Sequence, residues 1–145
     1  MGIAVGLTVL AGLAGAVQVA VMGRFGARVG IVEALTFATG VQLLLAVVVL
    51  LIVRLGAGGI GGGFRSPPWM WLGGLMGLIL VFAVTFAQPR IGAAATIGTL
   101  VAGQFVMGAV IDRFGLFGVA QIGLSWTRLL GVGLLAAGAG LSLAR

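Results

Sequence analysis

The sequence has few charged residues for its length. It contains eight Arg, one Glu and one Asp in 145 residues, so that 7% of its residues are charged. A soluble domain carries about 25% charged residues, most of them on its surface. In this chain 61% of the residues are apolar and the mean hydropathy is +1.33. Ten charges cannot solvate a chain of this size, so we expect lipid to be the solvent for most of its surface.

Cysteine and histidine are both absent. Without Cys the chain can form no disulfide, and without either residue type we expect no zinc or haem site. The usual His-based catalytic arrangements are excluded for the same reason. We therefore expect no metal, no cofactor and no enzymatic activity. The net charge of +6 comes from single arginines between apolar runs rather than from a basic patch, so we expect no nucleic-acid binding.

Five apolar runs predict five transmembrane helices, which makes the fold all-α. Each run approaches or exceeds the roughly 20 residues that a helix needs to cross a hydrocarbon layer of about 30 Å. The predicted spans cover residues 3–22, 31–53, 69–87, 91–111 and 126–144. The first run lacks the basic flank of a signal peptide, so we expect a retained helix. The connections are short, and residues 1–145 are predicted to form a single five-helix membrane domain.

The arginines divide equally between the two sides of the predicted membrane domain. We call the side that holds the N-terminus face A and the opposite side face B. Face A holds Arg54, Arg65, Arg113 and Arg128, and face B holds Arg24, Arg28, Arg90 and Arg145. A protein is oriented by the difference in Arg and Lys between its faces, and here there is none. One interpretation is chance, with the N-terminal charges or a partner deciding the orientation. The other is dual topology, in which copies insert both ways and pair antiparallel, as the halves of an inverted-repeat transporter do.

Three glutamines lie inside predicted spans, at Gln18, Gln42 and Gln104. An amide in hydrocarbon is costly unless it is hydrogen-bonded. Each Gln therefore either bonds a neighbouring helix or lines a polar path for a substrate. At 1.5 Å per residue, Gln104 lies ~18 Å from face B and Gln18 ~22 Å from face A. In an antiparallel dimer, Gln18 and the partner's Gln104 would share a depth near the midplane, where transporters bind substrate.

The two acidic residues lie near the ends of predicted helices. Glu33 falls in the first turn of the second span, where the helix dipole favours a carboxylate, and Arg28 is close in sequence. This position favours an anchoring role, and a proton-coupling carboxylate is the alternative. Asp112 ends the fourth span, where the dipole disfavours it. A pairing with Arg113 or another arginine of face A would compensate, and would form a gate or a fixed hinge.

The stretch QPRIGAAATIGTLVAGQFVMGAVIDRFGLFG resembles the signature of the YdcZ family, which comprises short bacterial five-span proteins of the drug/metabolite transporter superfamily. The matching residues are Pro89, Arg90, Gly92, Ala93, Gly103, Gln104, Asp112, Phe114, Gly115 and Gly118. Arg128 resembles the start of the family's last helix, and Gln18 matches a polar position of its first. Two residues depart from the pattern: Met22 replaces a frequent Asn, and Glu33 is not a family feature.

The resemblance implies a function and an assembly. Family members are described as transporters without assigned substrates, and they occur as single genes, as adjacent pairs of opposite orientation and as fused ten-span chains. This implies one half of an inverted-repeat ten-helix transporter in the bacterial inner (cytoplasmic) membrane. The dimer would be an antiparallel homodimer, or a heterodimer with a homologous five-span chain.

We therefore expect a secondary transporter or exporter of a small metabolite or drug-like molecule that works by alternating access. The alternatives are a non-transporting membrane partner subunit and a small channel. The candidate residues of the substrate pathway are Gln18, Gln42, Gln104 and Glu33. The candidate residues of the structural motif are Pro89, Arg90, Gly92, Gly103, Asp112 and Gly115.

Overall fold

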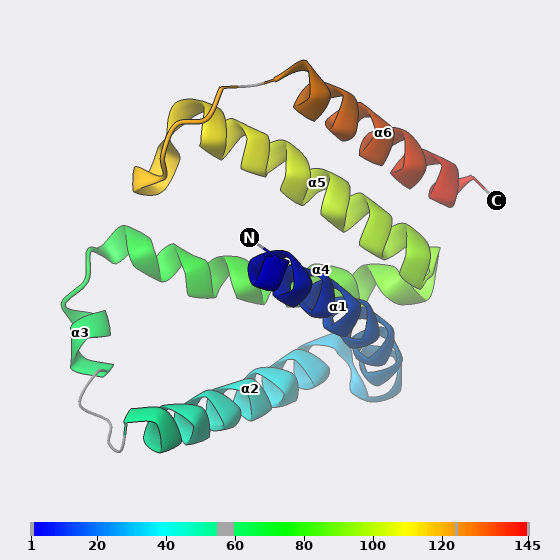
Figure 1. The fold of residues 1–145 in the computed structure, drawn as a ribbon. Coiled ribbons are helices and arrows are strands. Elements are labelled where there is room, and N and C mark those ends of the chain that lie inside the picture. The colour runs from blue at the N-terminus through cyan, green and yellow to red at the C-terminus, as the bar shows by residue number, and fades with distance from the viewer. Residues whose placement is uncertain (1, 55–59, 124, 145) are drawn as a thin grey trace. The chain divides into compact units, whose positions relative to one another are not determined.

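The computed structural model describes residues 2–54, 60–123 and 125–144 (Figure 1). Five long helices make up most of these residues, and no strand occurs among them. The long helices are α1 (Gly2–Val29), α2 (Ile31–Arg54), α4 (Leu72–Ile91), α5 (Ala93–Phe114) and α6 (Trp126–Leu143). The short ones are α3 (Ile60–Phe64), η1 (Pro68–Trp71) and η2 (Leu116–Gly118). The five long helices are long and apolar enough to cross a membrane, which confirms the predicted all-α fold with five transmembrane helices.

Two predicted connections are helical in the structure. α1 continues through Arg24 and Arg28, so the prediction of a loop over residues 23–30 is wrong. α4 likewise continues through residues 88–90, which lie between the predicted spans 69–87 and 91–111, and Pro89 lies in the last turn of α4. The apolar runs end just before Arg24 and Gln88, but Arg and Gln are good helix formers, so each helix continues through them.

Single glycines connect the consecutive helices in both places. Gly30 links α1 to α2 and Gly92 links α4 to α5, and both have positive φ angles, of 107° and 84°. Gly92 has a ψ of 163°, a conformation that is essentially restricted to glycine. Its carbonyl accepts hydrogen bonds from the amide (3.1 Å) and the hydroxyl (2.7 Å) of Thr96. A glycine at this position therefore allows one helix to end and the next to begin across a single residue.

The structure divides into two compact units, which we describe separately. Unit 1 is Met1–Val19 with Arg90–Arg145, and unit 2 is Ala20–Pro89, so that α1 contributes to both. The single membrane domain expected over residues 1–145 stays a prediction.

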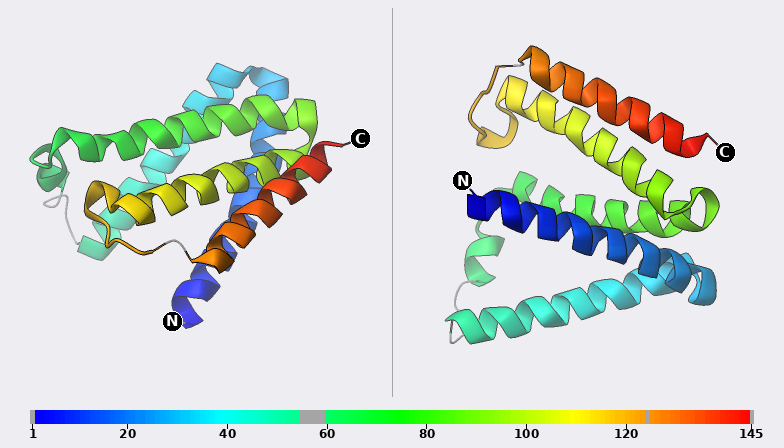
Figure 2. Two further views of the ribbon diagram at one scale, coloured as in Figure 1. Left: turned by 90° about the horizontal axis from the view of Figure 1, so that it is seen from above. Right: turned by 45° about the vertical axis from the view of Figure 1, so that its right-hand side comes forward.

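In unit 1, α5 and α6 form an antiparallel hairpin, and all views show them side by side (Figures 1 and 2). The helices approach closely at Gly98, where a Cβ would lie 3.6 Å from the Cα of Ala139. Near the middle of the hairpin, the ring of Phe105 lies against Gly131. In the connection, the Gln121 amide donates to the carbonyl of Phe114 at 3.3 Å. These contacts fix the register of α5 against α6.

In unit 2, the end of α1 packs on the end of α4 through two glycines. A Cβ at Gly23 would overlap the side chain of Gln88, and a Cβ at Gly26 would overlap Cγ2 of Thr85. The side chain of Thr85 is only 1% exposed, and its neighbour Val84 is 2% exposed. This contact therefore belongs to the buried core of unit 2.

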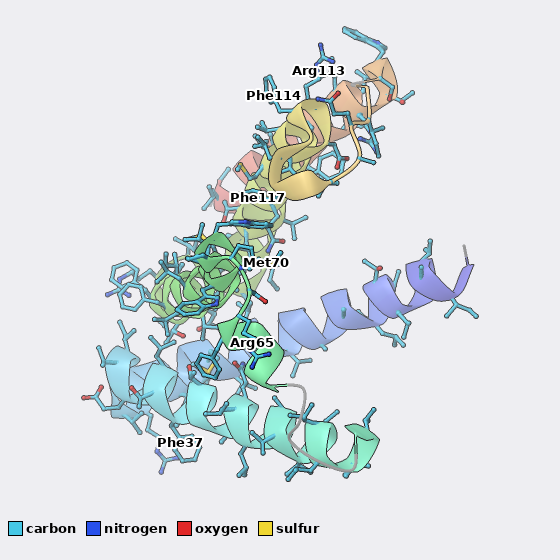
Figure 3. All side chains as sticks on the ribbon, turned by 90° about the vertical axis from the view of Figure 1, so that its left-hand side faces the viewer. Phe37, Arg65, Met70, Arg113, Phe114 and Phe117 are labelled. Carbon is cyan, nitrogen blue, oxygen red and sulfur yellow. The ribbon has the colours of Figure 1, made fainter. Side chains whose placement is uncertain are left out.

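The rest of the long helices is open to the surroundings. The fraction of buried residues in the spans ranges from 0% in α2 to 17% in the span Pro68–Ile91. Large apolar side chains project outward, as Phe37 and Met70 do in Figure 3. Such a surface is suited to lipid or to a partner helix rather than to water.

Candidate functional site

A small cavity lies between α5 and α6, near the end of α5 that was assigned to face A. Its volume is about 190 Å³, and it is lined by Gln104, Phe105, Gly108, Ala109, Asp112 and Arg128. Gln104, Gly108 and Asp112 are four residues apart and share one face of α5. Because Gly108 has no side chain, the helix surface is hollow between the amide and the carboxylate.

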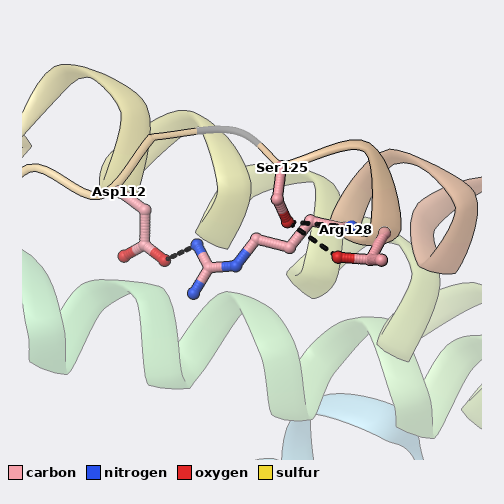
Figure 4. Close-up of polar contacts among 4 residues, drawn as sticks. Asp112, Ser125 and Arg128 are labelled. Carbon is pink, nitrogen blue, oxygen red and sulfur yellow. Dashed lines mark hydrogen bonds and ion pairs between the residues drawn. The ribbon is translucent and has the colours of Figure 1, made fainter.

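Two of the residues that line this cavity, Asp112 and Arg128, form an ion pair (Figure 4). Nη1 of Arg128 donates to Oδ2 of Asp112 at 2.8 Å, and the two side chains are 38% and 29% exposed. The hydroxyl of Ser125 caps α6, accepts from the backbone N–H of Arg128 at 3.4 Å, and shares a hydrogen bond with the hydroxyl of Thr127. The sequence predicted that Asp112 pairs with Arg113 or with another arginine of face A. In the structure the partner of Asp112 is Arg128.

Each charge of this pair lies at the helix end that disfavours it. Asp112 is in the last turn of α5, where the helix dipole is negative, and Arg128 is in the first turn of α6, where it is positive. The ion pair offsets both unfavourable positions. Because both side chains are partly exposed, solvent screens their attraction. The pair is therefore suited to exchange its partners.

Of the expected pathway residues, the cavity contains only Gln104. Gln42 lines a broader groove of about 580 Å³ in unit 2, together with Thr39 of α2 and residues 74, 75, 77 and 78 of α4. Gln18 is half-buried in α1 and does not line the α5–α6 cavity. No hydrogen bond joins the three glutamine amides to other residues that the structure describes. Their predicted role as links between helices stays a prediction.

Glu33 lies apart from the cavity, in unit 2. It is exposed in the first turn of α2, as its position in the sequence indicated, and its carboxylate lies against Gly30. No ion pair joins it to Arg28, although the structure describes both residues. Its role as an anchor or as a proton carrier stays a prediction.

The motif residues occupy structural positions around the two ends of α5. Pro89 and Arg90 form the last turn of α4, and Gly92 is the link to α5. Gly115 ends α5 with a φ of 62°, and its N–H donates to the carbonyl of Ile111. Gly103 lies on an open face of α5, where a Cβ would meet nothing within 4 Å.

Sequence reasoning missed three glycines that shape the molecule. Gly108 creates the hollow of the cavity, and Gly23 and Gly26 permit the contact between α1 and α4. The role of Gly108 could have been predicted, because Gln104, Gly108 and Asp112 are spaced four residues apart and therefore share one face of a helix. The other two lay in a segment that was expected to be a loop, so no helix spacing could be applied to them.

Five helices that are long and apolar enough to cross a membrane define a multi-pass membrane protein. The chain belongs to the YdcZ family, because the family model described as "Putative inner membrane exporter, YdcZ" matches residues 3–141. This confirms the family indicated by the resemblance of residues 88–118, and the protein is a multi-pass protein of the inner membrane. No curated protein and no solved structure matches the chain.

Proposed function

We propose that this protein is a secondary transporter that exports a small polar metabolite, and that the cavity between α5 and α6 binds the substrate. The observation that carries the proposal is the Asp112–Arg128 pair, which shares a hollow with Gln104 in a chain that has only two acidic residues. Ionisable groups in membrane proteins typically mark substrate or ion pathways. The description of the family as an exporter supports transport and suggests that the protein is not an enzyme.

The transporting form is an antiparallel dimer that works by alternating access. The equal division of arginines between the faces and the odd number of spans support pairing of inverted copies. The low burial of the spans, 0–17%, leaves ample helix surface for a partner. Because the cavity lies near one end of α5, the cavities of two inverted copies would open toward opposite sides of the membrane. A heterodimer with a homologous five-span chain would have the same geometry.

The volume of the cavity favours a small metabolite over a drug-like molecule. At about 190 Å³ it is smaller than the pockets of roughly 300–1,000 Å³ that bind drug-sized ligands. Opening and closing of the Asp112–Arg128 pair would control access to the cavity. Energy would come from a gradient, since the sequence contains no ATP-binding motif.

The test is metabolite flux into liposomes that contain the purified protein, with Asp112→Asn compared with Arg113→Gln. Arg113 is the matched control because it neighbours Asp112 but is exposed and does not line the cavity. We expect saturable flux that Asp112→Asn abolishes and Arg113→Gln preserves. Flux that never saturates would instead indicate a channel. Flux that requires a second five-span chain would support the heterodimer, and no flux even with that chain would indicate a non-transporting subunit.

A further inference from the structure

We infer that the α5–α6 cavity recognises a small zwitterion, a molecule of amino-acid size with one ammonium and one carboxylate group. This inference rests on the proposed function and names the substrate class of the same site. It follows from the arrangement of charges around the cavity, from the partial exposure of the ion pair and from the size of the hollow.

The two sides of the cavity entrance carry opposite electrostatic character. On the α5 side, the Asp112 carboxylate coincides with the negative end of the helix dipole. On the α6 side, the Arg128 guanidinium coincides with the positive end of the other dipole. An ammonium beside Asp112 and a carboxylate beside Arg128 would each meet both a full charge and a favourable helix end.

The ion pair leaves donors and acceptors available for such a ligand. The ion pair joins one guanidinium nitrogen of Arg128 to one carboxylate oxygen of Asp112. The guanidinium has further N–H groups and the carboxylate has a second oxygen. A zwitterion can therefore insert between the two side chains and exchange one ion pair for two, and the side chains are exposed enough (38% and 29%) to be reached.

A ligand with only one charge is a poorer fit to the same entrance. An amine would pair with Asp112 but would separate it from Arg128, and an acid would leave Asp112 without a partner. Once such a ligand covers the pair, the charge that is left without a partner also loses its contact with water, which is costly. The ion pair, which has one charge of each sign, therefore selects a ligand that also has one charge of each sign.

The interior of the cavity sets the size and polarity of the remainder of the ligand. The cavity volume of about 190 Å³ lies below the roughly 300–1,000 Å³ of pockets that bind drug-sized ligands. Phe105, Gly108 and Ala109 present apolar surface, and Gln104 lies two helix turns from Asp112. A short aliphatic or amide side chain would fill this space.

Equilibrium binding to the purified protein tests the inference without requiring transport. The probes are radiolabelled glycine, alanine, leucine and glutamine. The competitors for leucine are isopentylamine, which lacks the carboxylate, and 4-methylpentanoate, which lacks the ammonium group. We expect saturable binding of at least one of the four amino acids. We also expect unlabelled leucine to displace radiolabelled leucine at a concentration at least about tenfold lower than either analogue requires. Equal competition by the amine or by the acid would overturn the inference, as would the absence of saturable binding for all four amino acids.

A charge exchange separates a ligand site from a structural ion pair. In the double variant Asp112→Arg with Arg128→Asp, the pair is retained and both charges agree with their helix ends, so we expect the protein to stay folded. The polarity of the entrance is reversed, however, and we expect amino-acid affinity to fall about tenfold or more. Arg113→Gln should bind as the unchanged protein does. Unaltered affinity in the double variant would show that the pair is only structural.

Binding and flux together distinguish this inference from the proposed function. Saturable amino-acid binding without flux in liposomes would support the site and contradict transport. Saturable flux of a solute that is not a zwitterion, with no amino-acid binding, would overturn the site and leave the proposed function intact.

Discussion

The contact of α1 with α4 and the cavity end of the contact between α5 and α6 are built in opposite ways. The first relies on the absence of side chains: at Gly23 and Gly26 a Cβ would overlap α4, and Thr85 opposite is almost fully buried. At the cavity end of α5 and α6 the contact instead relies on side chains, because the partly exposed Asp112–Arg128 ion pair joins the two helices. The opposite end of the same two helices meets closely at a glycine, Gly98.

The difference indicates which contact can change during function. Backbones that meet through glycines cannot separate without losing dispersion contacts along both helices. A pair of partly exposed charges can exchange its partners at a small cost, because water screens both states. We therefore expect changes in unit 2 to affect folding and changes around the α5–α6 cavity to affect function.

The largest expected effect is that of Gly26→Leu. Because Thr85 is buried and β-branched, it cannot make room for the new side chain, and overpacking typically costs about 1–3 kcal/mol. We expect loss of the monodisperse protein in size-exclusion chromatography. Gly40→Leu on α2 is the control, since nothing lies within 4 Å of a Cβ there. A stable Gly26→Leu variant would contradict the assigned contact of α1 with α4.

Replacement of two motif glycines by alanine should have unequal effects on the stability of the fold. Gly92→Ala forces a side chain into a backbone conformation that favours glycine, at a cost of about 1–3 kcal/mol. Gly103→Ala places its methyl group in open space within a helix, and we expect no loss or a gain of up to about 1 kcal/mol. Thermal unfolding in detergent measures both. A destabilised Gly103→Ala would show that another chain packs on this face of α5.

Arg128→Gln should damage function more than stability. We expect a loss of no more than about 1 kcal/mol, because the ion pair is partly exposed to solvent. Flux into liposomes should nevertheless be lost, since Asp112 would have no permanent partner at the cavity entrance. Thermal unfolding and flux are measured on the same preparation. If Arg128→Gln fails to fold while Gly26→Leu is tolerated, the ion pair rather than the contact of α1 with α4 is required for folding.

Gln104→Ala and Gln42→Ala form a pair that separates the cavity from the groove between α2 and α4. Either amide contributes about 1 kcal/mol or less as a helix–helix hydrogen bond, so both variants should remain folded. Only Gln104→Ala should reduce flux, because Gln104 lines the cavity between α5 and α6. Reduced flux in Gln42→Ala alone would move the substrate site to unit 2. Loss of the assembled dimer without a specific flux defect would favour packing roles.

Glu33→Gln should have the smallest effect. An exposed carboxylate in the first turn of a helix contributes no more than about 0.5 kcal/mol after screening. A proton carrier must instead change its protonation state in every cycle, so the amide would abolish flux driven by a proton gradient. The measurement is proton-driven flux beside substrate binding. Lost coupling with intact binding would assign Glu33 the role of proton carrier.

The number and approximate position of the spans could be predicted because length and hydropathy are local properties of the chain. The ends of α1 and α4 could not, because apolar runs stop at Arg24 and Gln88 although the helices continue. Asp112 could be recognised as an anion at an unfavourable helix end. Its pairing with Arg128 rather than Arg113 depends on the register of α5 against α6, which only tertiary contacts such as that of Gly98 with Ala139 define.

The single-residue links have a consequence for biosynthesis. Gly30 and Gly92 are all that separates α1 from α2 and α4 from α5, so neither pair has slack for one member to enter the bilayer and the other to wait. We therefore expect the two helices of each pair to enter the bilayer together. Any reversal of topology would turn over both helices of a pair together.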